Sequence, residues 1–461
     1  MTIQKNAPHQ PLERASFGDD FLWGCSTSAF QIEGAGSTDN RVASIWDTFC
    51  ATPGNIRDGA DGQVACDHYH RWPEDLDLGQ SLGLNAYRFS IAWPRIFSGV
   101  GQPPNEAGLD FYSRLVDGML ERGLQPWATL YHWDLPQALQ DQGGWANRAT
   151  VDAFVEYADV VTRRLGDRVR HWITHNEPWC TAMHGNLDGM HAPGLRDASI
   201  ALQVCHHVLL SHGLATPVIR ANVPEAQVGI ALSLHPIRAA SNSEADRQAV
   251  ERHDGFRNRW FLDPLYGRGY PQATLALLGE AAPTVQEGDM QAIAAPTDFV
   301  GLNYYFPEVV RDAPDSGAPA GFLRTEVALP QDRERTDFGW EVAPDGLTEL
   351  LLRIAREYQP GTVYVTENGS SYDDLVRADG SIDDEARRRY LVRHLAAVRA
   401  AQEQGVAVKG YFAWSLLDNF EWSEGYLRRF GIVHVDFETQ QRTLKSSGRW
   451  YREFLHGRNE H

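Results

Sequence analysis

Two glutamates of the 461-residue chain follow directly after short apolar runs in the sequence. Glu177 follows one run and lies beside Asn176, and Glu367 follows another and lies beside Asn368. Because Glu is a poor strand residue, a carboxylate at such a place needs hydrogen-bond partners or an open mouth to face. One carboxylate of this kind is as often a helix cap as a reactive group. Two of them, each beside an Asn, favour a shared chemical site.

Paired carboxylates are the groups that glycoside hydrolysis requires. One holds a proton for the leaving oxygen, while the other, ionised, attacks or stabilises the anomeric carbon. Their surroundings must therefore separate their pKa values. Arg88 lies within the segment 87–90 and offers a positive charge that would keep one carboxylate ionised. A surface salt bridge is the alternative for Arg88, and the apolar neighbours argue against it.

Aromatic, amide and histidine side chains accompany the ends of several apolar runs. They are Gln31, His132, Trp133, Asn303, Tyr305, Trp414, Glu421 and Trp422. Aromatic faces suit the C–H side of a pyranose, and amides, His and Glu can hydrogen bond to neighbouring hydroxyls. Any single Trp is more often a core residue, and His132 is explained equally well as a structural histidine. No metal-ligand spacing lies near it, so we expect no metal, and no cofactor is expected.

Eight strand-like apolar runs alternate with stretches of helical period, as in βα units around a parallel sheet. The runs are 21–27, 86–93, 125–133, 171–176, 227–234, 298–304, 362–366 and 408–415. Their number in an unbroken chain favours one closed barrel over an open doubly wound sheet. In such barrels the chemistry lies at the carboxyl ends of the strands, where both glutamates stand.

Four segments between the runs have the apolar spacing of amphipathic helices. One stripe runs from Leu109 to Leu120, with Gly123 placed as a C-terminal cap, and others span 151–165 and 347–354. A fourth helix is expected to begin near Ser381, with Asp384 completing a capping box, and to end near Gly405. Each is expected to bury one face against the sheet.

The predicted fold is therefore a (β/α)8 TIM barrel of the α/β class, a single domain with long loops at its C-terminal face. We expect it to occupy 17–455, between a loose N-terminal tail (1–16) and a C-terminal tail (456–461). The segment 306–340 lacks periodicity, so it and 417–430 are expected to wall a pocket. The alternative for 306–340 is a mobile surface insertion.

Composition narrows the choice of partners. Asp and Glu outnumber Lys and Arg by 61 to 42, and the resulting charge of −19 argues against nucleic acid and anionic membranes. The first residues lack the apolar stretch of a secretory signal, which predicts a cytoplasmic protein. The five cysteines show no metal or redox spacing and are expected to be free thiols. A small neutral ligand is the expected partner, and homo-oligomerisation stays open.

From about 17 to 454, the chain resembles glycoside hydrolase family 1, the β-glucosidase family. The motifs that carry the resemblance are FLWG at 21–24, QIEG at 31–34, YRFS at 87–90, YHWD at 131–134, THNEP at 174–178, GLNYY at 301–305, YVTENG at 364–369 and WSLLDNFEW at 414–422. The sequence NGS at 368–370 matches the pattern of a glycosylation acceptor, and the resemblance explains it instead as part of the second glutamate's motif.

The resemblance implies a role for each site residue. Glu177 would protonate the departing group and Glu367 would attack the anomeric carbon, so that configuration is retained and the carboxyls lie only about 5–5.5 Å apart. Asn176 would hold the 2-hydroxyl, while Arg88 and Tyr305 would orient and tune Glu367. The remaining hydroxyl contacts would come from Gln31, His132, Trp133, Glu421 and Trp422, with Trp414 beneath the ring and Asn303 as support.

Single residues separate related activities. Thioglucosidases that resemble this chain carry Gln at the position of Glu177, and relatives acting on phosphorylated sugars replace the pair Glu421 and Trp422. Small neutral β-glycosides are therefore expected, with β-D-glucosyl and also β-D-galactosyl or β-D-fucosyl ends. A non-catalytic barrel is disfavoured because both glutamates are present, whereas a glycosyl transferase would use the same residues. The segment 184–191 lacks the Gly-Tyr pattern often seen in the family, so nothing is carried over for the aglycone side.

Overall fold

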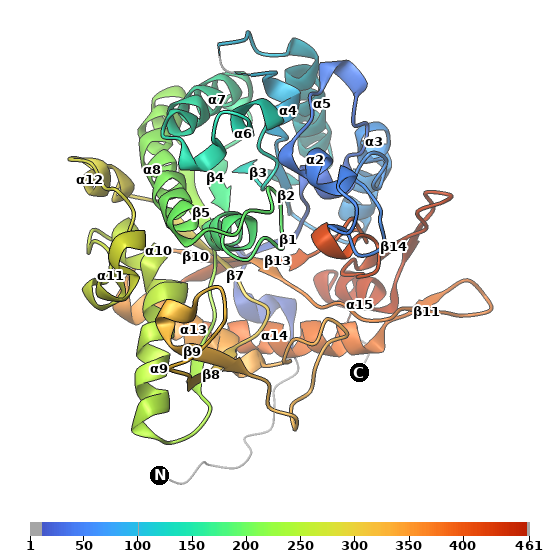
Figure 1. Ribbon diagram of the computed structural model, residues 1–461. Coiled ribbons are helices and arrows are strands. Elements are labelled where there is room, and N and C mark those ends of the chain that lie inside the picture. The colour runs from blue at the N-terminus through green and yellow to red at the C-terminus, as the bar shows by residue number, and fades with distance from the viewer. Residues whose placement is uncertain (1–11, 100, 459–461) are drawn as a thin grey trace.

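The computed structural model describes residues 12–99 and 101–458. Within them eight parallel strands close into a barrel, and each pairs with the next barrel strand along the chain until the last meets the first (Figure 1). The strands are β1 (Leu22–Ser26), β2 (Ala86–Ser90), β3 (Gln125–Tyr131), β4 (His171–Asn176), β5 (Gln227–Ser233), β7 (Phe299–Asn303), β10 (Val363–Asn368) and β13 (Val408–Trp414). The predicted (β/α)8 barrel and all eight of its strands are confirmed.

Two strand ends differ from the prediction in ways that matter for the site. The run 86–93 stops as a strand at Ser90, because Trp93 and Pro94 begin a short helix. The run 362–366 continues further, so that Glu367 belongs to β10 itself and pairs with Asn303 of β7. The second carboxylate is thus held by the barrel rather than by a loop.

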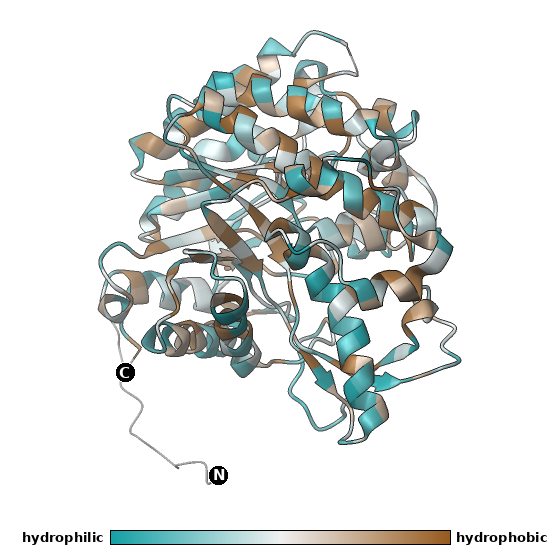
Figure 2. Cartoon of the chain, turned by 90° about the vertical axis from the view of Figure 1, so that its left-hand side faces the viewer, coloured by the Kyte–Doolittle hydropathy of each residue, from teal (hydrophilic) through white to brown (hydrophobic). Residues whose placement is uncertain are grey.

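Helices surround the barrel, and most of them carry both brown apolar and teal polar residues in Figure 2. The longer ones are α3 (His68–Ser81), α5 (Glu106–Glu121), α7 (Ala149–Leu165), α8 (Ala198–Asn222), α9 (Glu244–Asp254), α13 (Pro344–Glu357), α14 (Glu385–Glu403) and α15 (Ser446–Leu455). Shorter ones lie in the connections: α1 (Ala29–Ile32), α2 (Ile45–Ala51), α4 (Trp93–Ile96), α6 (Gln137–Gln140), α10 (Trp260–Leu265), α11 (Gln272–Leu278) and α12 (Asp289–Ile293).

The four predicted helices are present, with two corrections. Leu120, at the end of the α5 stripe, is exposed rather than buried, whereas Gly123 takes the left-handed backbone expected of a cap. The predicted capping box at the start of α14 is wrong. This helix begins at Glu385 after Asp384, and Ser381 instead donates to Asp379 in a tight turn. The carboxylate of Asp384 is engaged elsewhere, by Ser447 and Arg387.

Apolar rings fill the lower part of the barrel interior and support the polar layer above them. The Trp127 ring centroid lies 5.3 Å from that of Phe299 and 5.1 Å from that of Phe412. Inward positions alternate along a strand, so the residue two beyond Trp127, Thr129, also points inward. It accepts a hydrogen bond from Nε of Arg88, at 3.2 Å. The change from apolar to polar side chains marks where the core ends and the site begins.

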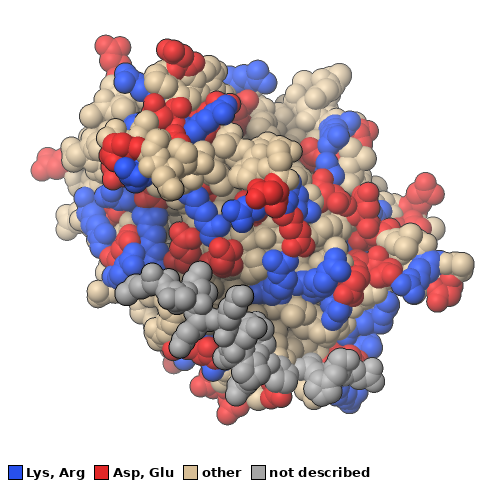
Figure 3. Space-filling model, turned by 90° about the horizontal axis from the view of Figure 1, so that it is seen from below, with Lys and Arg blue, Asp and Glu red and all other residues tan. Residues whose placement is uncertain are grey.

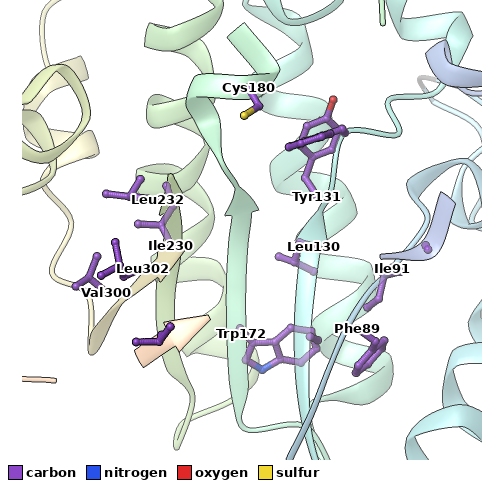
Figure 4. Packing of buried hydrophobic residues seen from close by; sticks show 14 of the residues in the cluster. Phe89, Ile91, Leu130, Tyr131, Trp172, Cys180, Ile230, Leu232, Val300 and Leu302 are labelled. Carbon is purple, nitrogen blue, oxygen red and sulfur yellow. The ribbon is translucent and has the colours of Figure 1, made fainter. Parts of the chain in front are cut away.

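Outward-facing strand residues pack against the helices. Figure 4 shows Leu130, Trp172, Ile230 and Leu302 along neighbouring strands, all fully buried or nearly so. Burying such side chains is the main favourable contribution to folding, at roughly 25 cal/mol per Å² of apolar surface. Each strand therefore packs against apolar side chains on both faces, those of the barrel interior and those of the surrounding helices.

The segments outside the barrel are more regular than the sequence suggests. The prediction that 306–340 lacks regular structure is wrong, because this segment forms β8 (Glu308–Asp312) and β9 (Thr325–Ala328). Strand β8 pairs with β9 on one side and with β6 (Ile237–Ala239) on the other, in a small sheet. Two hairpins complete the strands. They are β11 (Leu375–Val376) with β12 (Ile382–Asp383), and β14 (Val433–Val435) with β15 (Arg442–Leu444).

The predicted N-terminal tail lies only partly within the described residues. Residues 1–11 fall outside them, and Arg14–Phe17 form a short 3-10 helix instead of a loose chain. Arg14 donates from Nη1 to the carbonyl of Leu455 at 3.0 Å, so this segment is fastened to the end of α15. The short helix of residues 14–17 therefore lies beside the end of α15.

The surface is charged and mixed. Acidic and basic side chains alternate over the face in Figure 3, in keeping with exposed ion pairs such as Arg388 with Glu385. No helix among the described residues is long and apolar enough to cross a membrane.

We predict that Gly24→Ala destabilises the barrel. A Cβ at this β1 position would lie 2.3 Å from Cδ1 of Phe412, whose ring is enclosed by the interior core. Overpacking of this kind costs about 1–3 kcal/mol of unfolding free energy, measurable by urea denaturation. Gly317→Ala is the matched control, since no atom lies within 4 Å of its added Cβ. Equal stability of the two variants would contradict the prediction.

Candidate active site

Glu177 lies immediately after β4, on a left-handed backbone with φ of 45°. Its amide donates to the carbonyl of Ala231 in β5, at 2.9 Å, which fixes the turn. Oε1 accepts a hydrogen bond from Nδ2 of Asn303 at 2.8 Å, and Oε2 lies 3.0 Å from Sγ of Cys180. The carboxyl group is buried and held at both oxygens.

Glu367 is held by a charged partner and a phenol. Nη1 of Arg88 donates to Oε1 at 2.6 Å, and the hydroxyl of Tyr305 donates to Oε2 at 2.7 Å. Arg88 itself is fully buried in the barrel. Charge-assisted hydrogen bonds of this length are about twice as strong as neutral ones, so Glu367 has one well-defined orientation.

The two carboxylates belong to one hydrogen-bond network. Nη2 of Arg88 donates to Oδ1 of Asn176 at 2.7 Å, and Nδ2 of Asn303 donates to the same oxygen at 2.9 Å. The amide of Asn303 also reaches Glu177, while Arg88 reaches Glu367. A chain of side chains from β2, β4, β7 and β10 therefore connects one carboxylate with the other.

Burial and neighbouring charges set the protonation of Glu367. The pKa of Glu367 is raised to about 7: burial is the largest cause, the positive charge of Arg88 opposes the rise, and the negative charge of Glu177 contributes to it. The hydrogen bond from Tyr305 opposes the rise. Burial also raises the pKa of Tyr305 well above its usual range, so this hydroxyl stays a donor. Arg88 and Tyr305 are thus the groups that favour the ionised form.

His132 presents a free ring nitrogen to the site. Asn176 uses Oδ1 as an acceptor from Arg88, so its Nδ2 is the atom that faces Nε2 of His132, at 3.0 Å. Burial lowers the pKa of His132 well below its usual range, which keeps the ring neutral. Nε2 then accepts and Nδ1 carries the proton. Nδ1 is buried and has no partner among the described residues.

Three tryptophans form the aromatic part of the site. The ring centroid of Trp422 lies 4.6 Å from that of Trp133, and the His132 ring is nearly parallel to that of Trp414 at 5.8 Å. Trp133 and Trp422 both have left-handed backbones, with φ of 80° and 50°. Such conformations cost about 1–3 kcal/mol and tend to occur at functional sites.

The segment 417–430 carries a second unpartnered group. Oε2 of Glu421 is buried and accepts no hydrogen bond from the described residues. Burial raises the pKa of Glu421 to about 8, and the negative charges of Glu367 and Glu177 add to the rise. An acceptor held in this way is available to a hydroxyl donor.

Gln31 is brought to the same segment, although most of its amide is already engaged. Nε2 donates to Oδ1 of Asn419 and to the carbonyl of Phe420, and Oε1 accepts from Ser28. One lone pair of Oε1 remains. The structure therefore brings together all twelve predicted residues, and Gln31 keeps a single acceptor position open while the rest of its amide supports the neighbouring loop.

Two features of the site were missed in the sequence. Cys180 was expected to be merely a free thiol, but it lies beside Glu177. The half-buried ring of Trp340 packs against Tyr305, with centroids 5.2 Å apart. A spacing of three residues from Glu177 could have indicated Cys180, whereas nothing local in the sequence connects Trp340 with Tyr305.

A barrel whose strand ends hold two networked carboxylates amid aromatic rings defines the class of (β/α)8-barrel hydrolases. The model of glycosyl hydrolase family 1 matches residues 13–460, and the chain belongs to this family. It is similar to β-glucosidase A of Thermotoga maritima, with 47% identity over 94% of this chain and 96% of the relative. It is also 43% identical to a bifunctional β-D-glucosidase/β-D-fucosidase of Bifidobacterium breve, covering 95% of this chain and 98% of that one.

A solved structure gives the same result for the fold. The family 1 β-glucosidase from Thermotoga maritima superimposes with a TM-score of 0.93 at 45% identity, covering 96% of this chain and 99% of that chain. Because the matches span nearly the full length of both proteins, the barrel and its long connections are shared as a unit. The chain is therefore an enzyme of the glycosyl hydrolase class.

We predict that Tyr305→Phe moves the acidic limb of the kcat/KM pH profile to higher pH. Without the phenol, the ionised form of Glu367 loses a hydrogen-bond donor, so the pKa of Glu367 rises. Glu367 is then protonated, and activity is lost, at a higher pH than in the wild type. A shift of about 1 pH unit is expected from one hydrogen bond to a charged group. Tyr304→Phe is the control, because Tyr304 donates to the carbonyl of Ala343 instead. An unmoved limb, or equal shifts in both variants, would refute the assignment.

We also predict that Glu421→Gln stabilises the unliganded protein above pH 5. The folded pKa of Glu421 is raised to about 8, so the unfolded chain releases this proton first and the wild type loses stability as pH rises towards 8. The Gln variant does not lose stability in this way, and its free energy of unfolding at pH 8 is expected to exceed that of the wild type by about 1 kcal/mol. Denaturation at pH 5 and 8 measures it, with the exposed Glu438→Gln as control. A gain that does not grow with pH would contradict the buried charge.

Proposed function

We propose that the enzyme is a retaining β-glucosidase that removes terminal, non-reducing β-D-glucosyl residues. The observation that carries the proposal is the network in which Arg88, Asn176 and Asn303 join Glu177 to Glu367. It gives the two carboxylates different partners, one a neutral amide and the other a guanidinium. Different surroundings are what an acid and a nucleophile require. We further propose that the catalytic unit is the single barrel of 17–455.

In the proposed first step, the proton of Glu177 passes to the glycosidic oxygen while a carboxylate oxygen of Glu367 attacks the anomeric carbon. The C–O bond to the aglycone breaks with its electrons on the protonated oxygen, and an α-linked glycosyl ester forms on Glu367. In the second step, ionised Glu177 removes a proton from water, whose oxygen displaces Glu367 from the anomeric carbon. Two inversions leave the β-configuration.

The polar groups around the carboxylates suit the hydroxyls of a neutral sugar. Nδ1 of His132 can donate and Oε2 of Glu421 can accept, and neither has a protein partner among the described residues. A site with unpaired polar groups discriminates strongly for hydroxyls that satisfy them. We assign Asn176 to the 2-hydroxyl, and the carboxylate of Glu421 disfavours a phosphorylated sugar.

The remaining site residues receive roles in the same proposal. Trp414 lies beneath the pyranose, and Gln31, Trp133 and Trp422 complete the hydroxyl contacts. Support for a broader choice of sugars comes from the relative named for both β-D-glucosidase and β-D-fucosidase activity. We propose β-D-fucosyl and β-D-galactosyl ends as further substrates. Half-buried rings at the rim, such as Trp340, offer apolar faces for aryl aglycones or the second sugar of a cello-oligosaccharide.

Nucleophile rescue tests the proposal on p-nitrophenyl β-D-glucoside. Glu367→Ala is expected to lose nearly all activity and, with added azide, to form the α-glucosyl azide, because azide then occupies the place of the missing carboxylate. Glu177→Ala is expected to form the β-glucosyl azide, since there azide replaces water after the first step. Loss of the general acid alone typically costs about 10²–10⁴-fold.

The anomer first released by the wild type, followed by NMR, completes the experiment, with the exposed Glu326→Gln as control. A β-anomer released first supports the two-step mechanism. An α-anomer first, or a Glu367→Ala variant that keeps most of its activity, would overturn the assignment of both carboxylates.

A further inference from the structure

Among the described residues, Cys180 is the side chain that lies within hydrogen-bond reach of the Glu177 carboxyl group and is not used by the mechanism above. It begins the π-helical turn Cys180–His184, three residues after the glutamate, and the amide of Thr181 donates to the carbonyl of Glu177 at 3.2 Å. This geometry brings Sγ to 3.0 Å from Oε2. Figure 4 shows Cys180 at the end of the barrel to which the strands point.

The thiol is protonated here, so its S–H group can donate to the ionised carboxylate. Burial raises the pKa of Cys180 well above its usual range, and the negative charge of Glu177 raises it further, while Arg257 opposes the rise. A protonated thiol in hydrogen-bond reach of a carboxylate oxygen donates to it. Because Asn303 occupies Oε1, the proton of the acid form belongs on Oε2, the oxygen that faces the thiol. The S–H donor therefore favours the ionised form over the protonated one.

We propose that Cys180 is a positioning residue, which orients the carboxyl group of Glu177 and stabilises the ionised form that activates water. This inference rests on the proposed role of Glu177 as acid and base. The thiol sets how readily that group exchanges its proton between the two steps. It touches neither the sugar nor the reacting atoms, so its influence passes entirely through Glu177.

Other charged and titratable groups face Glu177 or Cys180 and must stay constant in a test. They are Glu367 of β10, Tyr305 after β7, Glu421 of the segment 417–430, and Arg257 of the turn Gly255–Arg259. A change confined to Cys180 leaves all of them in place. Cys180 also borders a small pocket that Trp46, Trp145 and Thr181 line with it.

The experiment compares Cys180→Val, which removes the donor at similar volume, with Cys180→Ser, which keeps one. In the valine variant the alkaline limb of the kcat/KM profile on p-nitrophenyl β-D-glucoside is expected to move about 0.5 pH unit upward, because the ionised form loses a donor. The serine variant is expected to return the limb towards its wild-type position. A merely structural role would lower the whole profile without moving the limb.

Controls separate this proposal from the function on which it rests. Cys205→Val removes a buried thiol in α8 and is expected to leave the limb unchanged, and Cys180→Ala gives a second donor-free variant should valine prevent folding. Glu177→Gln removes the titrating group itself. A limb that persists in Glu177→Gln would overturn the proposed role of Glu177. A limb that disappears there but stays in place in both donor-free Cys180 variants would overturn the role of Cys180 alone.

Discussion

The buried guanidinium of Arg88 is the interaction on which the site depends. A fully buried cation is tolerated only when its charge and its donors are satisfied, and here each nitrogen is engaged. Nε reaches Thr129, Nη1 reaches Glu367 and the carbonyl of Thr366, and Nη2 reaches Asn176. Four strands are thereby tied to one side chain. Removal of Arg88 would leave Glu367 without its countercharge and Asn176 without the bond that fixes its amide.

Several other features of the site lower the stability of the unliganded protein and suit it to bind a ligand. Trp133, Glu177 and Trp422 have left-handed backbones, and polar atoms of His132 and Glu421 are buried without a partner in the part of the chain that the structure describes. Each of these features costs free energy in the unliganded protein, and a sugar that supplies the missing partners recovers part of it. The apolar side chains inside the barrel and between the strands and the helices offset these costs, because their burial stabilises the strands that carry the site.

The sequence was sufficient for the barrel and for the twelve residues that the structure brings together at its strand ends, but not for Cys180 and Trp340. Strand periodicity located β4 and β10, and the rule that function lies at strand ends led directly to Glu177 and Glu367. The rule could not show that β10 continues through Glu367, since a Glu disfavours a strand until a buried Arg pairs with it. Contacts between distant segments were also out of reach. The bond between Gln31 and Asn419 and the packing of Trp340 on Tyr305 depend on how the long connections fold back.

Short-range features failed for a different reason. The capping box expected at Ser381 was wrong because Asp384 is recruited by Ser447 and Arg387, partners that local spacing does not reveal. The thiol of Cys180 follows Glu177 at a spacing of three residues, but its contact with the carboxyl group requires that the chain turn helically directly after the glutamate. Side-chain composition thus predicted which residues gather at the site, whereas the direction of each donor and acceptor required the structure.

Covalent trapping examines the nucleophile itself. A 2-deoxy-2-fluoro-β-D-glucoside with a dinitrophenol leaving group forms the glycosyl ester quickly but releases it slowly, because fluorine destabilises the electron-poor transition state of the second step. After incubation with the wild type, proteolysis and mass spectrometry should find one fluoroglucosyl group on the peptide that contains Glu367. A label on Glu177 or elsewhere, or turnover with no labelled peptide, would contradict the assignment of Glu367 as the carboxylate that Arg88 holds ready for attack.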